Sequence, residues 1–431
     1  MLRNFCIIIC LLIMTVAQAQ PKTDTLLANI LSNTGNELLN KLLSDPQHYR
    51  LQVVYTEINR DKKNVPHFKN HYFNYDPHLY FNPASMVKMP LAFLSLEKLN
   101  DLNIKGVDLN TTIQYDSSYK GQTALLKDPT SANGLPSIGH FIKRAFLISE
   151  NDPYNRMYQF VGQQAINRRL HEMGYTDVRI TRQFLGFTEE GNRHTNQVRF
   201  LDPSGKLIYT QPPAYNTDSF DFSRSIKVGD AHWDRNDNLI PGPFDFTKHN
   251  NLSLEDMQQM LQAVLFPASV PAKQRFRLTE NDLEFLYRYL SQYPSETDFP
   301  KYDTDEFYDS YVKFFFRDST RRMPGHVRVF NKTGWSYGFL TDVSYVVDFK
   351  NKVEYMLSAT VYVNSDGVVN DSKYDYDQVG YPFLFQLGQA VYEYELKRKR
   401  TRLPDLSRFS NIKYEKRDPL DQRPALKEVD N

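Results

Sequence analysis

Strand-like segments stand at both ends of the folded chain, and helix-like segments fill its middle. Residues 49–58 alternate apolar and polar side chains, and three further strand-like segments follow in sequence near the end, at 326–335, 340–349 and 353–363. Between them, helical patterns cover 137–148, 152–173, 253–265 and 279–292. This order predicts an α+β fold in which one antiparallel sheet is formed from both chain ends, helices pack on it, and an all-helical lobe is inserted.

Shorter patterns extend this prediction. Residues 23–45 have apolar side chains at helical spacing, 198–210 form a predicted hairpin around a Pro-Gly turn, and 381–400 close the fold as a helix. The apolar run after Ser85 predicts a buried helix, in which Pro90 is tolerated because it falls in the first turn. The polar tail, residues 397–431, is expected to be frayed and solvated.

Residues 1–19 carry the pattern of a secretory signal peptide. Arg3 precedes a run of twelve mainly apolar residues, and Ala17-Gln18-Ala19 forms a small-x-small cleavage site before Gln20. The apolar run is too short for a comfortable membrane span. We therefore expect a mature chain without a membrane span, exported to the periplasm or the extracellular space.

Both cysteines, Cys6 and Cys10, lie inside this leader. A mature chain without cysteine excludes disulfides, cysteine catalysis and thiolate metal sites. No metal or cofactor is predicted, because His67 and His71 lack a third ligand and neither H-E-x-x-H nor a glycine-rich phosphate loop occurs. The formal charge of +1 gives no bias towards nucleic acid, and a monomer is expected.

Ser85 and Lys88 are the first candidates for catalysis. On a helix, residues i and i+3 share a face, so the lysine amine would lie beside the serine hydroxyl. A partly desolvated lysine, or one near another cation, can be neutral enough to take the serine proton. The spacing alone is weak, because S-x-x-K occurs five times: Ser85/Lys88, Ser95/Lys98, Ser117/Lys120, Ser310/Lys313 and Ser410/Lys413.

The second candidate group is Ser149-Glu150-Asn151, which lies between two predicted helices. A second hydroxyl can relay a proton to a leaving nitrogen, and an amide can hold a substrate carbonyl. Another S-x-N, Ser131-Ala132-Asn133, lies in a turn-rich loop with no helix directly after it.

The third group is Lys332-Thr333-Gly334, the chain's single K-[ST]-G, inside a predicted strand. A cation and a hydroxyl on a strand facing the nucleophile would bind a substrate carboxylate. Gly334 is expected to let the substrate backbone approach closely, because glycine has no Cβ.

In this order and setting, the three groups resemble the motifs of the penicillin-recognising serine hydrolases, and within them the class A β-lactamases. The likeness covers about residues 45–395, including "GLPSIGHFIKRAFLISEND", "HEMGYTDVRITR", "LSLEDMQQML" and "LTDVSYVV". It implies a β-lactamase/transpeptidase-like fold.

The resemblance also implies roles. Ser85 would form a covalent acyl-enzyme after Lys88 takes its proton, Ser149 would relay a proton and Asn151 would hold a carbonyl. The backbone N–H groups of Ser85 and Trp335 would form the oxyanion hole. Lys332 and Thr333 would bind the carboxylate.

The omega loop departs from the class A pattern. Asn155 would brace this loop by resemblance, but Phe184 of "QFLGF" stands where those enzymes carry the glutamate that directs the deacylating water. Glu189 and Glu190 follow a few residues later and are the candidate deacylation bases. Which of them, if either, turns towards Ser85 is left open by the sequence.

The sequence therefore predicts an exported serine hydrolase of the class A β-lactamase type that opens β-lactam amides, with slow antibiotic turnover. A D,D-peptidase or another amide hydrolase acting on cell-wall peptides is the alternative, as is a catalytically weak penicillin-binding protein. The expected organisation is a leader at 1–19, a catalytic domain at 20–396 and a tail at 397–431. Within that domain we expect a sheet lobe at about 45–84 and 326–396, and a helical lobe at about 85–325 with atypical insertions at about 186–250 and 295–325.

Overall fold

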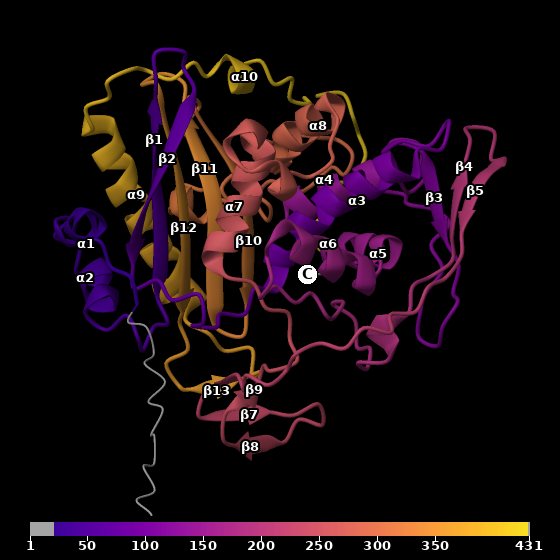
Figure 1. Ribbon diagram of the computed structural model, residues 1–431, viewed down its shortest axis with the longest axis horizontal. Coiled ribbons are helices and arrows are strands. Elements are labelled where there is room, and N and C mark those ends of the chain that lie inside the picture. The colour runs from indigo at the N-terminus through magenta and orange to yellow at the C-terminus, as the bar shows by residue number, and fades with distance from the viewer. Residues whose placement is uncertain (1–20, 430–431) are drawn as a thin grey trace, which may run out of the picture.

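A five-stranded antiparallel sheet forms the centre of the computed structural model, which describes residues 21–429 (Figure 1). Its strands are β1 (Gln52–Arg60), β2 (Pro66–Phe73), β10 (Val327–Ser336), β11 (Phe339–Asp348) and β12 (Val353–Tyr362), in the order β10-β11-β12-β1-β2. Because β12 pairs directly with β1, the prediction of one sheet built from both chain ends is confirmed. The predicted leader and its cleavage site lie outside the described residues.

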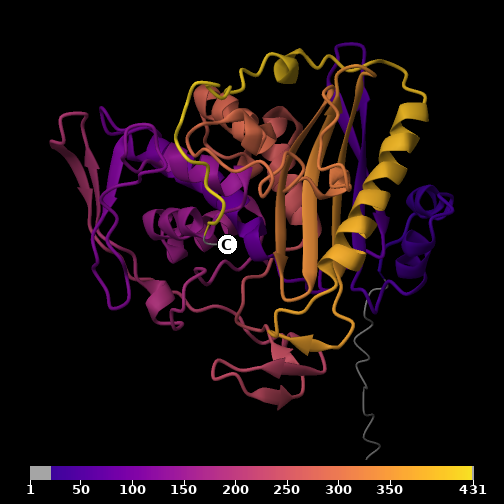
Figure 2. The ribbon, with the colours of Figure 1, turned by 180° about the vertical axis from the view of Figure 1, so that it is seen from behind.

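Three helices cover the outer face of this sheet: α1 (Thr25–Ser32), α2 (Glu37–Ser44) and α9 (Tyr381–Lys397) (Figure 2). The segment 23–45 divides into α1 and α2 because Gly35 has a φ of 68° and Asn36 caps α2 by accepting the N–H of Leu39. Leucines of α1 and α2 share one apolar cluster with Leu387 and Val391 of α9.

The opposite face of the sheet carries the helical lobe, whose helices are α3 (Lys88–Leu102), α4 (Ile138–Leu147), α5 (Asn151–Val161), α6 (Gln163–Met173), α7 (Leu254–Leu265) and α8 (Glu280–Ser291). Helix α7 packs on β11 and β12, and α8 packs on β10. The segment 152–173 is two helices because Gly162, with a φ of 90°, ends α5.

The segments beyond these helices add small sheets to the lobe. β3 (Thr112–Tyr115), β4 (Val198–Leu201) and β5 (Leu207–Gln211) form one of them, and its β4–β5 pairing confirms the predicted hairpin. β6 (Lys227–Val228) pairs with β9 (Phe244–Asp245). β7 (Ala231–Trp233) pairs with β8 (Leu239–Pro241) and runs parallel to β13 (Val368–Val369). The β7–β13 pairing ties the insertion to the segment that follows β12.

The tail is not frayed, so this expectation was wrong. It leaves α9, crosses the upper edge of the sheet and runs down to the helical lobe (Figure 2). Leu406 and Phe409, the latter in the short helix α10 (Ser407–Ser410), are buried in the main apolar cluster. Further on, Glu415 forms an ion pair with Lys143 of α4, with 2.7 Å between Oε2 and Nζ. The two apolar side chains and the paired charge hold a segment whose composition is otherwise polar.

Candidate active site

Ser85 and Lys88 meet where a short 3₁₀ helix, η1 (Ala84–Val87), runs into α3. A 3₁₀ helix has three residues per turn, so the side chains at i and i+3 eclipse each other. Accordingly Lys88 Nζ lies 2.7 Å from Ser85 Oγ. In the next copy of the motif, Ser95 and Lys98 instead bond to backbone carbonyls. The tertiary setting thus distinguishes one S-x-x-K from another.

The S-x-N group converges on the same amine. Ser149 Oγ lies 3.3 Å and Asn151 Oδ1 2.8 Å from Lys88 Nζ, which also bonds to the backbone carbonyl of Ser149. From the other side, Lys332 Nζ donates to Ser149 Oγ at 2.9 Å. The structure therefore brings residues from all three predicted motifs into one hydrogen-bonded group around Ser149.

The K-T-G strand is more deeply buried than expected. Lys332 and Thr333 are 2% and 0% exposed, and the cavity wall at this point is formed instead by Trp335 and Ser336. The hydroxyl of Thr333 has no hydrogen-bond partner within residues 21–429. Carboxylate recognition by Lys332 and Thr333 thus stays a prediction.

Gly334 has a structural role that the sequence did not predict. A Cβ built on Gly334 would lie 2.4 Å from the carbonyl oxygen of Pro83 and 3.0 Å from the backbone nitrogen of Met86. The missing side chain therefore makes room for η1, the chain's own backbone, and close approach of a substrate at Gly334 stays a prediction. This contact holds η1, which carries Ser85, against β10.

Burial sets the protonation of the two lysines. Desolvation lowers the pKa of Lys88 well below its usual value, and the nearby charge of Lys332 lowers it further, while Glu150 acts in the opposite direction. Desolvation also lowers the pKa of Lys332 to about 7, although Asp342 opposes this shift. A neutral Lys88 beside Ser85 has the properties of a general base.

Two residues of the site lie in the left-handed backbone region: Ala84, with a φ of 44°, and Ser149, with a φ of 71°. Such strain persists only where the surroundings hold it in place. Next to Ser149, the carboxylate of the buried Glu150 binds Arg144 and accepts a 2.5 Å hydrogen bond from the hydroxyl of Tyr302. Tyr302 belongs to the segment 295–325, so this insertion braces the S-x-N loop.

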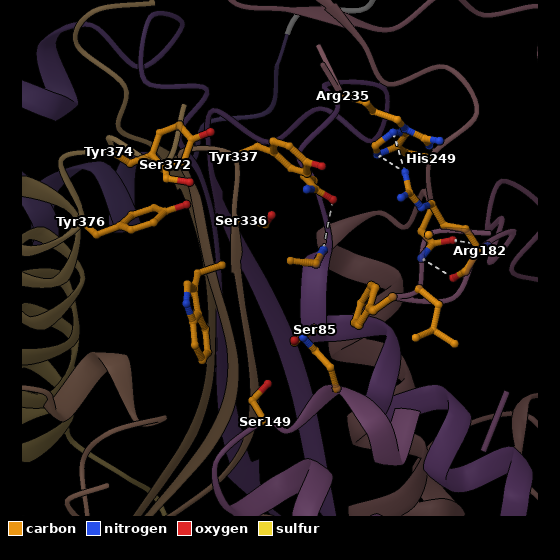
Figure 3. A pocket seen from close by; sticks show the side chains of 18 residues that line it. Ser85, Ser149, Arg182, Arg235, His249, Ser336, Tyr337, Ser372, Tyr374 and Tyr376 are labelled. Carbon is orange, nitrogen blue, oxygen red and sulfur yellow. Dashed lines mark hydrogen bonds between the residues drawn. The ribbon is translucent and has the colours of Figure 1, made fainter. Parts of the chain in front are cut away.

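Ser85 opens into a cavity of about 690 Å³ (Figure 3). Tyr374 and Tyr376 lie on one side of it, and Arg182, Arg235 and His249 on the other. None of these five was predicted from the sequence, because no motif marks them and they come from segments far apart in the chain. For Arg182, Arg235 and His249, the signal was the length of the chain between the S-x-N and K-T-G motifs; Tyr374 and Tyr376 lie beyond both motifs and had none.

The omega-loop residues are placed as follows. Asn155 accepts the N–H of Phe184 at 2.8 Å, as expected of a residue that braces this loop. Phe184 lines the cavity, with its ring centroid 5.3 Å from Lys88 Nζ. Glu189 and Glu190 face away: Glu189 pairs with Lys248 at 2.7 Å, and Glu190 contacts His194 at 3.1 Å. Neither glutamate lines the Ser85 cavity in this structure, and their side chains are 65% and 53% exposed.

A serine beside a buried lysine, facing an S-x-N loop and a K-T-G strand on an antiparallel sheet, defines the penicillin-recognising serine hydrolases. A family model described as "Beta-lactamase enzyme family" matches residues 36–394. The chain belongs to this family.

Several solved structures resemble the chain. They include a β-lactamase from Streptosporangium roseum (15% identity, TM-score 0.46, covering 85% of this chain and 99% of that one). A β-lactamase from Streptomyces albus G has 13% identity and a TM-score of 0.46, covering 82% and 99%. A mutant of PBP-A in an acyl-enzyme complex with penicillin G has 11% identity and a TM-score of 0.45, covering 86% and 97%. No curated protein matches the sequence. Within residues 21–429, no helix is both long and apolar enough to cross a membrane.

Proposed function

We propose that the protein is an acyl-serine enzyme that opens amides of cell-wall peptides and of β-lactams through Ser85, and that it releases β-lactam products slowly. The observation that carries this proposal is the contact between Ser85 Oγ and the buried Lys88 Nζ, at 2.7 Å. Surface lysines keep their proton at neutral pH, whereas a lysine desolvated to this degree can exchange it with a hydroxyl.

In the proposed acylation, neutral Lys88 takes the proton of Ser85 Oγ, and the oxygen attacks the carbonyl carbon of the amide. The negative charge on the carbonyl oxygen is stabilised by the backbone N–H groups of Ser85 and Trp335. Ser149, which contacts both buried lysines, passes a proton to the leaving nitrogen as the C–N bond breaks. The acyl group then remains on Ser85.

The missing carboxylate argues for slow release. A hydrolytic water needs a base within about 2.6–3.2 Å, and general-base catalysis is worth typically about 10²–10⁴-fold. No Asp or Glu of the described chain lines the Ser85 cavity. Phe184 lines it at the position where the class A pattern has a glutamate. This favours the peptidase or penicillin-binding alternative over a fast class A β-lactamase.

Intact-protein mass spectrometry over time after mixing with benzylpenicillin tests the proposal. We expect rapid formation of one adduct and slow return to the free mass, no adduct in Ser85→Ala, and a normal adduct in Ser95→Ala. Glu189→Gln and Glu190→Gln should release at the parent rate. Labelling of folded Ser85→Ala would refute the nucleophile, and fast release that either glutamine variant abolishes would refute the account of deacylation.

We also propose export with cleavage after Ala19. The support is the pattern of residues 1–19 together with the wall-peptide substrate class, which is found outside the inner membrane. N-terminal sequencing of the mature protein checks this, and a retained Met1 in the envelope fraction would contradict it.

A further inference from the structure

The cavity above Ser85 has a cationic wall that the proposed acylation does not use. Arg182 and Arg235 line this cavity together with Ser85, with His249 beside them (Figure 3). Ser149, which serves the leaving group, lies on the opposite side of Ser85 from Arg235 in this view. The wall therefore faces the part of a substrate that stays on the serine.

The Arg182 guanidinium of this wall bonds to a histidine, His249. The Arg182 guanidinium donates to His249 Nε2 at 2.7 Å. Burial and the two arginines lower the pKa of His249 to about 3, so the imidazole is neutral at physiological pH. Two acids line a neighbouring cavity that shares Arg182, Arg235 and His249 with this one. Glu189 is paired with Lys248, whereas Asp245 accepts from Thr247 and its charge opposes the lowering of the His249 pKa.

Both arginines stand on anchored backbone. Asn250 accepts the N–H of Arg182 at 3.1 Å and donates to its carbonyl oxygen at 3.3 Å. Arg235 lies in the turn between β7 and β8, and that hairpin is tied to β13 by the strand pairing and by a 2.9 Å bond from Asn370 to the Trp233 carbonyl. Two guanidinium groups on anchored backbone that line one cavity suit a carboxylate, with which they can form charge-assisted hydrogen bonds.

We propose that Arg182 and Arg235 form an anion subsite for a carboxylate on the acyl side of the scissile amide, separate from the carboxylate assigned to Lys332 and Thr333. The preferred substrates would then be amides with an acidic acyl group. This inference rests on the proposed function for the position of the acyl group.

Benzylpenicillin and carbenicillin are a matched pair of probes, because carbenicillin carries one additional carboxylate on the side-chain carbon next to the amide. Calorimetric Kd values are measured at pH 7.5 on full-length Ser85→Ala, which cannot form the acyl bond. We expect carbenicillin to bind about tenfold or more tightly than benzylpenicillin, as charge-assisted hydrogen bonds predict. Adding Arg182→Gln and Arg235→Gln should reduce this ratio to about one.

Arg322→Gln is the matched control, since Arg322 is exposed and does not line the cavity, and it should keep the ratio. Arg235→Gln alone changes only a surface turn and should lower the ratio without risk to the fold. A ratio near one in Ser85→Ala, no measurable binding of either penicillin, or a ratio that survives the double substitution overturns the subsite. Failure of the parent protein to acylate would instead overturn the proposed function, whatever the ratio.

Discussion

At the scale of single residues, the site depends on two buried lysines that share one hydroxyl. Lys88 and Lys332 both contact Ser149 Oγ, at 3.3 and 2.9 Å. Two like charges so close together in a desolvated site disfavour double protonation, and the charge of Lys332 accordingly lowers the pKa of Lys88. The arrangement suits one neutral base and one cation, the division that acylation of a carboxylate-bearing substrate requires.

This division predicts a bell-shaped pH profile for the second-order acylation rate with benzylpenicillin. Acid protonates Lys88 and removes the base, so the rate falls at low pH. Alkali removes the charge of Lys332, whose pKa is about 7, so the rate also falls above about pH 7. Stopped-flow acylation from pH 5 to 9 measures both limbs.

Lys332→Arg should extend the alkaline limb, because a guanidinium stays charged throughout this range. A reactive ester without a carboxylate should show no alkaline limb, and Lys88→Ala should be slow with both substrates. Equal alkaline losses for the ester and the penicillin would contradict the assignment of Lys332.

At the scale of elements, Ser85, the proposed nucleophile, is positioned by the contact of η1 with β10. This contact exists because Gly334 presents no Cβ to Pro83 and Met86. The strand and the 3₁₀ helix together fix Ser85 relative to Lys332, whose motif lies 247 positions further along the chain. Fixed geometry of this kind is what general-base catalysis needs.

Gly334→Ala should therefore lower the free energy of unfolding by about 1–3 kcal/mol, since a methyl group is forced into a packed contact. It should also slow acylation. Urea unfolding and adduct formation measure the two effects. Gly325→Ala is the control, because a Cβ at Gly325 meets nothing within 4 Å. A tolerated Gly334→Ala with the parent's acylation rate would show that the contact does not position Ser85.

At the scale of the whole molecule, the tail joins the sheet to the helical lobe. Phe409 packs with ring centroids 5.1 Å from Phe330 of β10 and 5.5 Å from Tyr287 of α8. Beyond it, the Leu426 N–H donates to Lys301 O at 2.8 Å, within the insertion that also carries Tyr302. The tail thus contacts the segment whose Tyr302 binds Glu150, the neighbour of Ser149.

Phe409→Ala should lower the free energy of unfolding by about 3–5 kcal/mol, the usual cost of removing a buried aromatic side chain. Leu420→Ala in the same tail should change it by less than about 0.5 kcal/mol, because Leu420 is 79% exposed. Chemical denaturation of the two variants beside the parent decides between a packed and a solvated tail. Similar small effects at both positions would mean that the tail is dispensable.

Local patterns determined a large part of this protein. Alternation at 49–58 and in the three late strand segments was enough to predict a sheet from both chain ends, because a strand's period of two is written in consecutive residues. The S-x-x-K, S-x-N and K-T-G groups were predictable because the chemistry needs particular residue types at short spacing. The patterns did not predict that 23–45 and 152–173 each contain two helices. Single residues such as Gly35 and Gly162 end a helix inside an otherwise continuous apolar pattern.

Only the tertiary structure decided the features that depend on segments far apart in the chain. Glu189 could not be assigned from sequence, because its orientation is set by Lys248, 59 positions away. Gly334 serves η1, and the polar tail is held by Phe409, for the same reason. Arg235 and Arg182 line one cavity, and the hairpin that carries Arg235 is held there by β13, more than 130 positions further along the chain. Contacts between distant segments follow from packing of the whole molecule, and spacing along the sequence carries no trace of them.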